Sequence, residues 1–163
     1  MKEVAILLLL AVMLNGCGSS TAVESPSASV WQSVMSGGVG TSSGFLFNTQ
    51  FTVSSGGALS ISSFQLLNQG TCFGSVGPTP TGTLNVTYNS ADQISGTFSF
   101  TIPSSAGDVI TLTSSSVTGT VNVNNSNLLS GVSIIGTWAL VPGSGSGCVA
   151  ASGSFTMTQT NAT

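Results

Sequence analysis

Apolar and polar side chains alternate along most of the chain beyond residue 44. Val, Leu, Ile, Phe or Trp falls at every second position, with Thr, Ser or Asn between, which is the period of a β-strand whose two faces differ. No window shows the period and capping residues of a helix. Clusters of Gly, Pro, Asn, Asp and Ser mark turns between the runs. The predicted strands span residues 45–53, 59–67, 83–89, 94–102, 108–113, 117–123, 132–140 and 149–157.

This pattern predicts an all-β domain built as a single antiparallel meander of about eight strands. One face of each strand is apolar and the other is rich in hydroxyl groups, which is typical of antiparallel sheets with one face toward water. The alternation does not distinguish a barrel from a sandwich, and both remain open.

A short repeat, Gly-[Thr/Ser]-apolar-x-apolar, recurs along the predicted strands. Each glycine shares its strand parity with the apolar pair that follows. We therefore expect the glycines to leave room for a bulky neighbour across the sheet, or to permit the bends that curl a meander. The repeats are unequally spaced, which argues against a solenoid. They begin at Gly82, Gly96, Gly119, Gly136 and Gly153.

The amino-terminal segment has a different character. The uncharged run Val4 to Leu14 is well short of the ~20 residues that cross a bilayer, and has the length of a signal-peptide core. The sequence Leu14-Asn15-Gly16-Cys17 resembles the lipobox of bacterial lipoproteins. That resemblance implies cleavage after Gly16, a diacylglyceryl group on the Cys17 sulfur, and acylation of the new amine. The alternative is a plain secretory signal that contains a cysteine.

The lipobox resemblance divides the chain into a signal-peptide helix (1–16), a lipidated flexible tether (17–28) and a β-domain (29–163). Small polar residues around Pro26 fit a tether. The resemblance implies a cell-envelope protein held to the membrane through Cys17. Gly18 occupies the position where lipoproteins retained in the inner membrane often carry Asp, which favours the outer membrane in a diderm bacterium.

The chain has three cysteines. Assigning Cys17 to the lipid leaves Cys72 and Cys148, which can form a disulfide in an oxidising compartment. Two separate buried thiols are the alternative. Two sulfurs without histidine do not make a tetrahedral metal site, so we expect no metal and no other cofactor.

Charge is nearly absent: charged residues make up 3% of the chain, with one basic residue and no histidine. The shortage of Lys and Arg excludes a nucleic-acid surface.

Gly40 to Gly44 matches the G-x-S-x-G nucleophile motif but has no histidine base to activate its serine. Asp92 and Asp108 flank the strand predicted at 94–102, too far apart for paired acid–base catalysis, and are expected to be turn residues. We therefore do not expect an enzyme.

The aromatic residues separate into two groups. Phe98, Phe100, Trp138 and Phe155 share parity with aliphatic residues and are expected in the core. Trp31 and Tyr88 are the candidates for stacking against a ligand such as a sugar.

The early Trp31, the Gly-Thr repeats, and Cys148 ahead of Gly153-Ser154-Phe155 are similar to small uncharacterised β-rich lipoproteins of bacteria. Gly136-Thr137-Trp138 also resembles a short motif of lipocalin-like and avidin-like barrels. Neither resemblance implies a particular ligand. We expect a lipid-anchored envelope protein that acts as a non-catalytic structural or interaction module, with an envelope protein as its partner. The alternative is a binding barrel or module for a neutral ligand, such as a glycan or a small apolar molecule.

Overall fold

A computed structural model of the 163-residue chain describes residues 21–22, 25–38, 44–70, 72–88, 93–122 and 128–160. Within these residues the protein contains strands and no helix. The strands are β1 (Thr21–Ala22), β2 (Ser25–Gly37), β3 (Phe45–Val53), β4 (Leu59–Gln69), β5 (Thr81–Tyr88), β6 (Ile94–Pro103), β7 (Val109–Asn122), β8 (Leu128–Val141) and β9 (Ala151–Thr160).

The nine strands form one antiparallel sheet in the order β1-β5-β6-β7-β8-β9-β2-β3-β4. Two meanders, β2 to β4 and β5 to β9, are joined because β2 pairs with β9, with Val30 opposite Thr160 and Gly37 opposite Gly153. The two-residue strand β1 lies on the outer edge of β5. The predicted all-β fold with one antiparallel sheet is confirmed.

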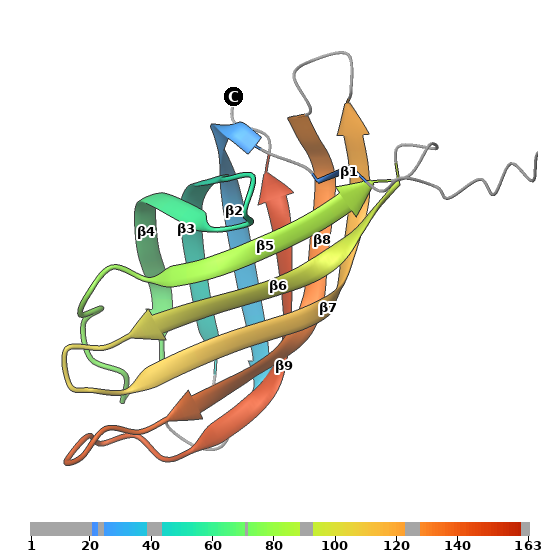
Figure 1. The fold of residues 1–163 in the computed structure, drawn as a ribbon. Coiled ribbons are helices and arrows are strands. Elements are labelled where there is room, and N and C mark those ends of the chain that lie inside the picture. Colours follow the sequence, from blue (N-terminus) through green and yellow to red (C-terminus); the bar gives the residue numbers. More distant parts are fainter. Residues whose placement is uncertain are drawn as a thin grey trace, which may run out of the picture.

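The sheet curls until its two edges approach each other (Figure 1). In the view, β5, β6 and β7 cross over β2, β3 and β4. Ala58 forms an isolated bridge with Thr83, and the Leu84 amide donates to the Gly57 carbonyl at 2.7 Å. Among the described residues, β4 and β5 share no longer ladder, so the sheet is a curled, open half-barrel. We call the line between β4 and β5 the seam.

Aromatic rings fill the inside of this curl. Trp31 stacks on Phe51 with ring centroids 5.0 Å apart, and Phe47 stacks on Phe100 at 5.6 Å. The four residues expected in the core from strand parity are buried, as predicted: Phe98, Phe100, Trp138 and Phe155.

The repeat glycines lie against these large side chains. Gly82 is opposite Phe100, and the pairs Gly136–Phe155 and Gly153–Trp138 repeat the arrangement between β8 and β9. A Cβ atom on any of these three glycines would overlap neighbouring atoms. The prediction that the glycines leave room for bulky neighbours across the sheet is confirmed at these positions.

Strand β2 was not predicted from the sequence. Its inward positions Trp31, Ser33 and Met35 include a serine, while Val34 points outward and is half exposed. With a polar residue on the inward face and an apolar residue on the outward face, β2 lacks the alternation from which the other strands were predicted. The backbone of β2 begins at Ser25, so the sheet extends into the segment expected to be a flexible tether.

Strand β7 was predicted as two strands, 108–113 and 117–123, and is continuous instead. A bulge between Thr113 and Ser116 shifts the register, so that Leu112 and Val117 both face inward although their parity differs. The last predicted strand begins late: β9 starts at Ala151, and Val149 is exposed in the preceding connection.

The curled sheet has two ends that differ in how they are held. The connections after β2, β4, β6 and β8 gather at one end, which we call the disulfide end. The opposite end, which we call the terminal end, carries β1, the start of β2, the end of β9 and the turn between β3 and β4.

Candidate functional site

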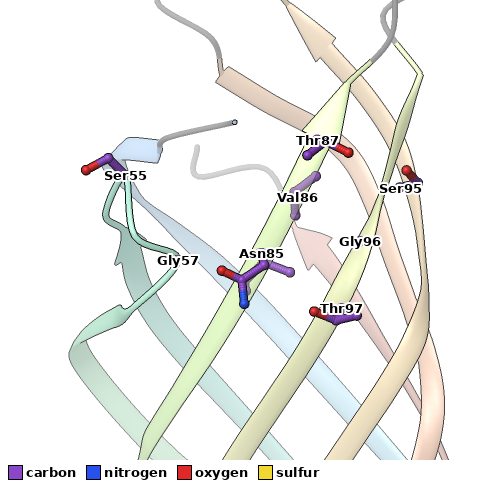
Figure 2. A pocket seen from close by; sticks show the side chains of 9 residues that line it. Ser55, Gly57, Asn85, Val86, Thr87, Ser95, Gly96 and Thr97 are labelled. Atoms are coloured by element: carbon purple, nitrogen blue, oxygen red, sulfur yellow. The ribbon is translucent and has the colours of Figure 1, made fainter. Parts of the chain in front are cut away.

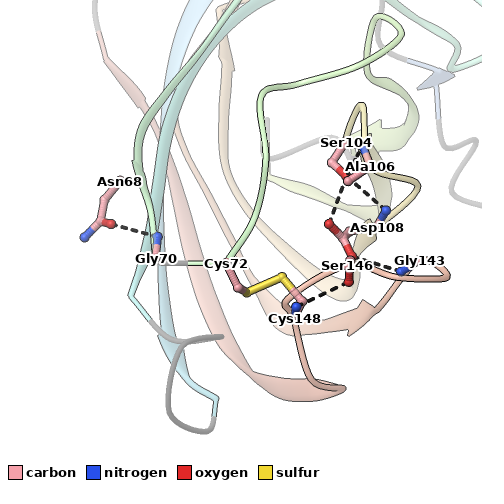
Figure 3. Close-up of a disulfide and its surroundings, with 9 residues drawn as sticks. All are labelled: Asn68, Gly70, Cys72, Ser104, Ala106, Asp108, Gly143, Ser146 and Cys148. Atoms are coloured by element: carbon pink, nitrogen blue, oxygen red, sulfur yellow. Dashed lines mark hydrogen bonds between the residues drawn. A yellow bond between two sulfur atoms is a disulfide. The ribbon is translucent and has the colours of Figure 1, made fainter.

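Cys72 and Cys148 form a disulfide at the disulfide end (Figure 3). It joins the β4–β5 connection to the β8–β9 connection across 76 residues of sequence, which confirms the predicted pair over two separate thiols. Closing a loop of that length stabilises the fold by about 4 kcal/mol in the chain-entropy model. Phe73, next to Cys72, is buried and packs edge-on against Phe45 at 5.8 Å.

The carboxylate of Asp108 lies beside this disulfide and is fully buried (Figure 3). The Ser104 hydroxyl donates to Oδ2 at 3.0 Å, and the Gly143 amide donates to Oδ1 at 2.9 Å. Asp108 lies in the β6–β7 turn, as predicted. The sequence does not indicate that its carboxylate also reaches the β8–β9 connection. Asp92 lies outside the described residues.

Burial disfavours the charged form of Asp108 and by itself would raise the pKa of the carboxyl group. Hydrogen bonds from the Ser146 side chain, the Gly143 amide and the Ser104 side chain favour the carboxylate, and together they outweigh burial. The pKa of Asp108 is therefore lowered from its ordinary value. The ionised carboxylate holds the β6–β7 turn to the β8–β9 connection.

Trp31 is fully buried, so the expectation that it could serve as a surface stacking platform for a sugar is wrong. Its strand β2 lies between β3 and β9, with Thr49 opposite Trp31 on one side and Gln159 on the other. The side chain of Tyr88 lies outside the described residues, and its backbone pairs with Thr21 and Ile94.

Three buried polar atoms on β2 and β9 have no hydrogen-bond partner among the residues that the structure describes: Trp31 Nε1, Ser33 Oγ and Gln159 Oε1. The Trp31 and Gln159 backbones are directly opposite each other, and Ser33 is two residues further along β2 on the same face. The amide nitrogen of Gln159 donates to the Ser29 hydroxyl at 3.0 Å. Sequence reasoning missed this group because it did not predict β2.

Two hollows lie along the seam. In the hollow near the terminal end, of about 290 Å³, the Asn85 amide lies over Gly57 of the β3–β4 turn (Figure 2). The other, of about 330 Å³, lies between Phe64 on β4 and Pro80 before β5. Both are lined by uncharged residues, so they offer amides, hydroxyls and apolar surface to a guest. The first is lined by Ser55, Gly57, Leu84, Asn85, Val86, Thr87, Ser95, Gly96 and Thr97.

Several predicted positions lie outside the described residues. They include the whole signal peptide, Gly16 and Cys17 of the lipobox, and the serines of the Gly40 to Gly44 motif. In the part of the chain that the structure describes, no helix is long and apolar enough to span a bilayer. The same residues contain no group of three or more His, Cys, Asp or Glu side chains placed to hold a metal ion.

The fold and these sites define a class: a β-domain of one curled antiparallel sheet with almost no charged side chains, tied at one end by a disulfide and a buried carboxylate. Comparison with protein-family models, with curated proteins and with solved structures finds no match to the chain.

Proposed function

We propose that the chain is a lipid-anchored cell-envelope protein whose β-domain is a non-catalytic structural or interaction module. The observation that carries the proposal is the pairing of the cysteines. Cys72 and Cys148 are joined to each other, which leaves Cys17 of the lipobox-like segment as the remaining thiol for a lipid. Disulfides form and persist outside the reducing cytoplasm, so the bridge supports export.

The lipid would be the whole of the membrane attachment. Two or three acyl chains, at about 0.8 kcal/mol for each buried methylene, hold a protein stably on a bilayer. Lys2, the single basic residue of the chain, would leave with the signal peptide. The mature domain would therefore have no cationic side chain to attract acidic lipids. In a diderm bacterium, Gly18 after the cysteine favours the outer membrane.

Mass spectrometry of the protein purified from its native envelope tests the proposal. We expect a mature chain that begins at Cys17 and carries a diacylglyceryl group with a further acyl chain on its amine. Cys17→Ser is the matched variant and should remain an unprocessed precursor. An unmodified Cys17, or a mature chain that begins elsewhere, contradicts the proposal.

A second candidate function, binding a small neutral molecule inside the curl, is favoured by the unpartnered atoms of Trp31, Ser33 and Gln159. A buried polar atom without a partner costs about 1–3 kcal/mol, so native proteins rarely leave such atoms unsatisfied. A hydroxyl group can accept from the indole N–H or donate to the Gln159 oxygen. The atoms therefore suit a neutral guest that carries a hydroxyl.

Native mass spectrometry of the purified protein tests this second candidate. We expect a stoichiometric neutral adduct, and about tenfold weaker retention in Ser33→Ala, the equivalent of losing one hydrogen bond. Ser60→Ala, at an exposed position on β4 outside both hollows, is the matched control. A protein that carries only water in both forms contradicts ligand binding at this place.

A further inference from the structure

The described chain near the amino terminus is attached to one end of the sheet. Thr21 pairs with Tyr88 and Ala22 with Thr87, the last residues of β5. Ser25, the first residue of β2, pairs with Val53, the last residue of β3. These pairings all lie at the terminal end, whereas the Cys72–Cys148 bridge lies at the opposite end, next to the start of β9.

This attachment shortens any tether that leads to a lipid on Cys17. A tether free as far as residue 28 would reach about 40 Å at ~3.5 Å per residue. With Thr21 held against β5, the reach from Cys17 is about 14 Å at the same rise. A strand of β9's length spans about 33 Å, or about 25 Å along the axis of a curled sheet after allowing for strand tilt. The shortened tether cannot bring the disulfide end to the bilayer while the terminal end stays away.

We propose that the domain stands end-on to the membrane, with its terminal end facing the lipid headgroups and its disulfide end facing outward. The inference rests on the proposed lipid anchor, and it specifies the surface that meets the bilayer. Ser54, Ser55 and Gly56 of the β3–β4 turn are exposed at this surface and offer hydroxyls and backbone amides to neutral headgroups. The disulfide end is left free to meet a partner in the envelope.

Because the domain has almost no charge, the proposed orientation should not depend on ionic strength. The described residues contain no Lys or Arg, so acidic headgroups are not attracted to any part of the described surface. The orientation is therefore set by the point of attachment. Raising the ionic strength about tenfold, which shortens the Debye length about threefold, should leave it unchanged.

The experiment compares spin labels at the two ends of the lipidated full-length protein, reconstituted in phosphatidylcholine vesicles that contain nickel-chelating lipid. Ser55→Cys and Ser144→Cys place a single free thiol on exposed positions at the terminal and disulfide ends, with the native disulfide intact. Nickel at the headgroups relaxes a nearby nitroxide far more strongly than a distant one. We expect at least threefold stronger relaxation at residue 55 than at residue 144. Equal relaxation, or the reverse order, overturns the proposal.

A variant in the tether separates the role of β1 from that of the anchor. Ala22→Pro restricts the backbone of the residue that pairs with Thr87, is expected to free the tether and should reduce the difference between the two labels. A difference that persists unchanged in Ala22→Pro contradicts the role assigned to β1. Mass spectrometry of the same samples reports the lipid on Cys17 independently. An absent lipid overturns the anchor and the orientation together, whereas a lipidated protein with equal labels overturns the orientation alone.

Discussion

The two ends of the curled sheet are held by different kinds of interaction. The disulfide end is tied by a covalent bridge and by the buried Asp108 carboxylate, which join connections distant in sequence. At the terminal end, the described contacts include a short turn, the two-residue strand β1, the Ala58–Thr83 bridge and the hydrogen bond from Gln159 to Ser29. A protein with almost no charged side chains thus places one carboxylate and one disulfide where several connections meet, and leaves the other end to hydrogen bonds between uncharged groups.

The largest effect on stability is expected from removing the disulfide. Replacing Cys72 and Cys148 together by serine should lower the free energy of unfolding by about 4 kcal/mol, because the unfolded chain regains the entropy of a long closed loop. Urea denaturation followed by tryptophan fluorescence measures the loss. Dithiothreitol should lower the midpoint of the native protein and leave that of the double variant unchanged. A double variant as stable as the native protein would mean that the bridge adds nothing.

A smaller loss is expected from filling a space at the same end. Gly153→Ala should cost up to about 3 kcal/mol, because a methyl group there overlaps the Ser36 carbonyl and the Trp138 indole. Gly147→Ala is the matched control, since a Cβ atom at Gly147 meets nothing within 4 Å. Thermal unfolding of both variants measures the difference. Equal melting temperatures would contradict the packing described for the repeat glycines.

Removing the charge of Asp108 is expected to cost about 2 kcal/mol at neutral pH, the range for hydrogen bonds to a charged group. The pKa of Asp108 is lowered on folding, so its contribution is present above the pKa of the unfolded chain and is lost as the pH falls through the lower pKa of the folded protein. The stability of Asp108→Asn should therefore fall less in acid than that of the native protein. Asp92→Asn is the control, and urea midpoints across the acidic range give the comparison. Parallel pH profiles for Asp108→Asn and the native protein would rule out this role.

The smallest effect should come from the terminal end. Ala22→Pro disturbs a strand of two residues and is expected to change the free energy of unfolding by no more than about 0.5 kcal/mol. Hydrogen exchange should quicken at the end of β5 and stay slow near Cys148. A loss comparable with that of the cysteine variant would remove the contrast between the two ends.

The strands that could be predicted from the sequence are those in which apolar residues occupy every second position without interruption. Strands β5, β6 and β8 were found from their alternation, and the disulfide from the number of cysteines. Strand β2 was missed because Ser33 faces the core and Val34 faces outward. Strand β7 was divided in two because its bulge reverses the parity between Leu112 and Val117. The predicted number of strands agrees with the eight long strands only because these two errors cancel.

The candidate sites were less accessible to sequence reasoning because they depend on neighbours far along the chain. In the sequence, Asp108 has the character of an ordinary turn residue. Only the structure shows that the Gly143 amide donates a hydrogen bond to its carboxylate. Trp31 reads as an isolated aromatic residue, and its burial depends on β2 lying between β3 and β9. Local pattern carries no information on either contact.

The pairing of β2 with β9 also has a consequence for the way the protein is made. The two are the first and last long strands of the described residues, and the bond from Gln159 to Ser29 spans 130 residues. A chain that is synthesised or exported from its amino terminus would deliver β2 first and its neighbour β9 last. Contacts of such long sequence separation form slowly, because a long loop must close before the contact is made. The sheet can therefore be completed only after β9 has emerged, which would delay the folding of an exported chain during its passage through a membrane.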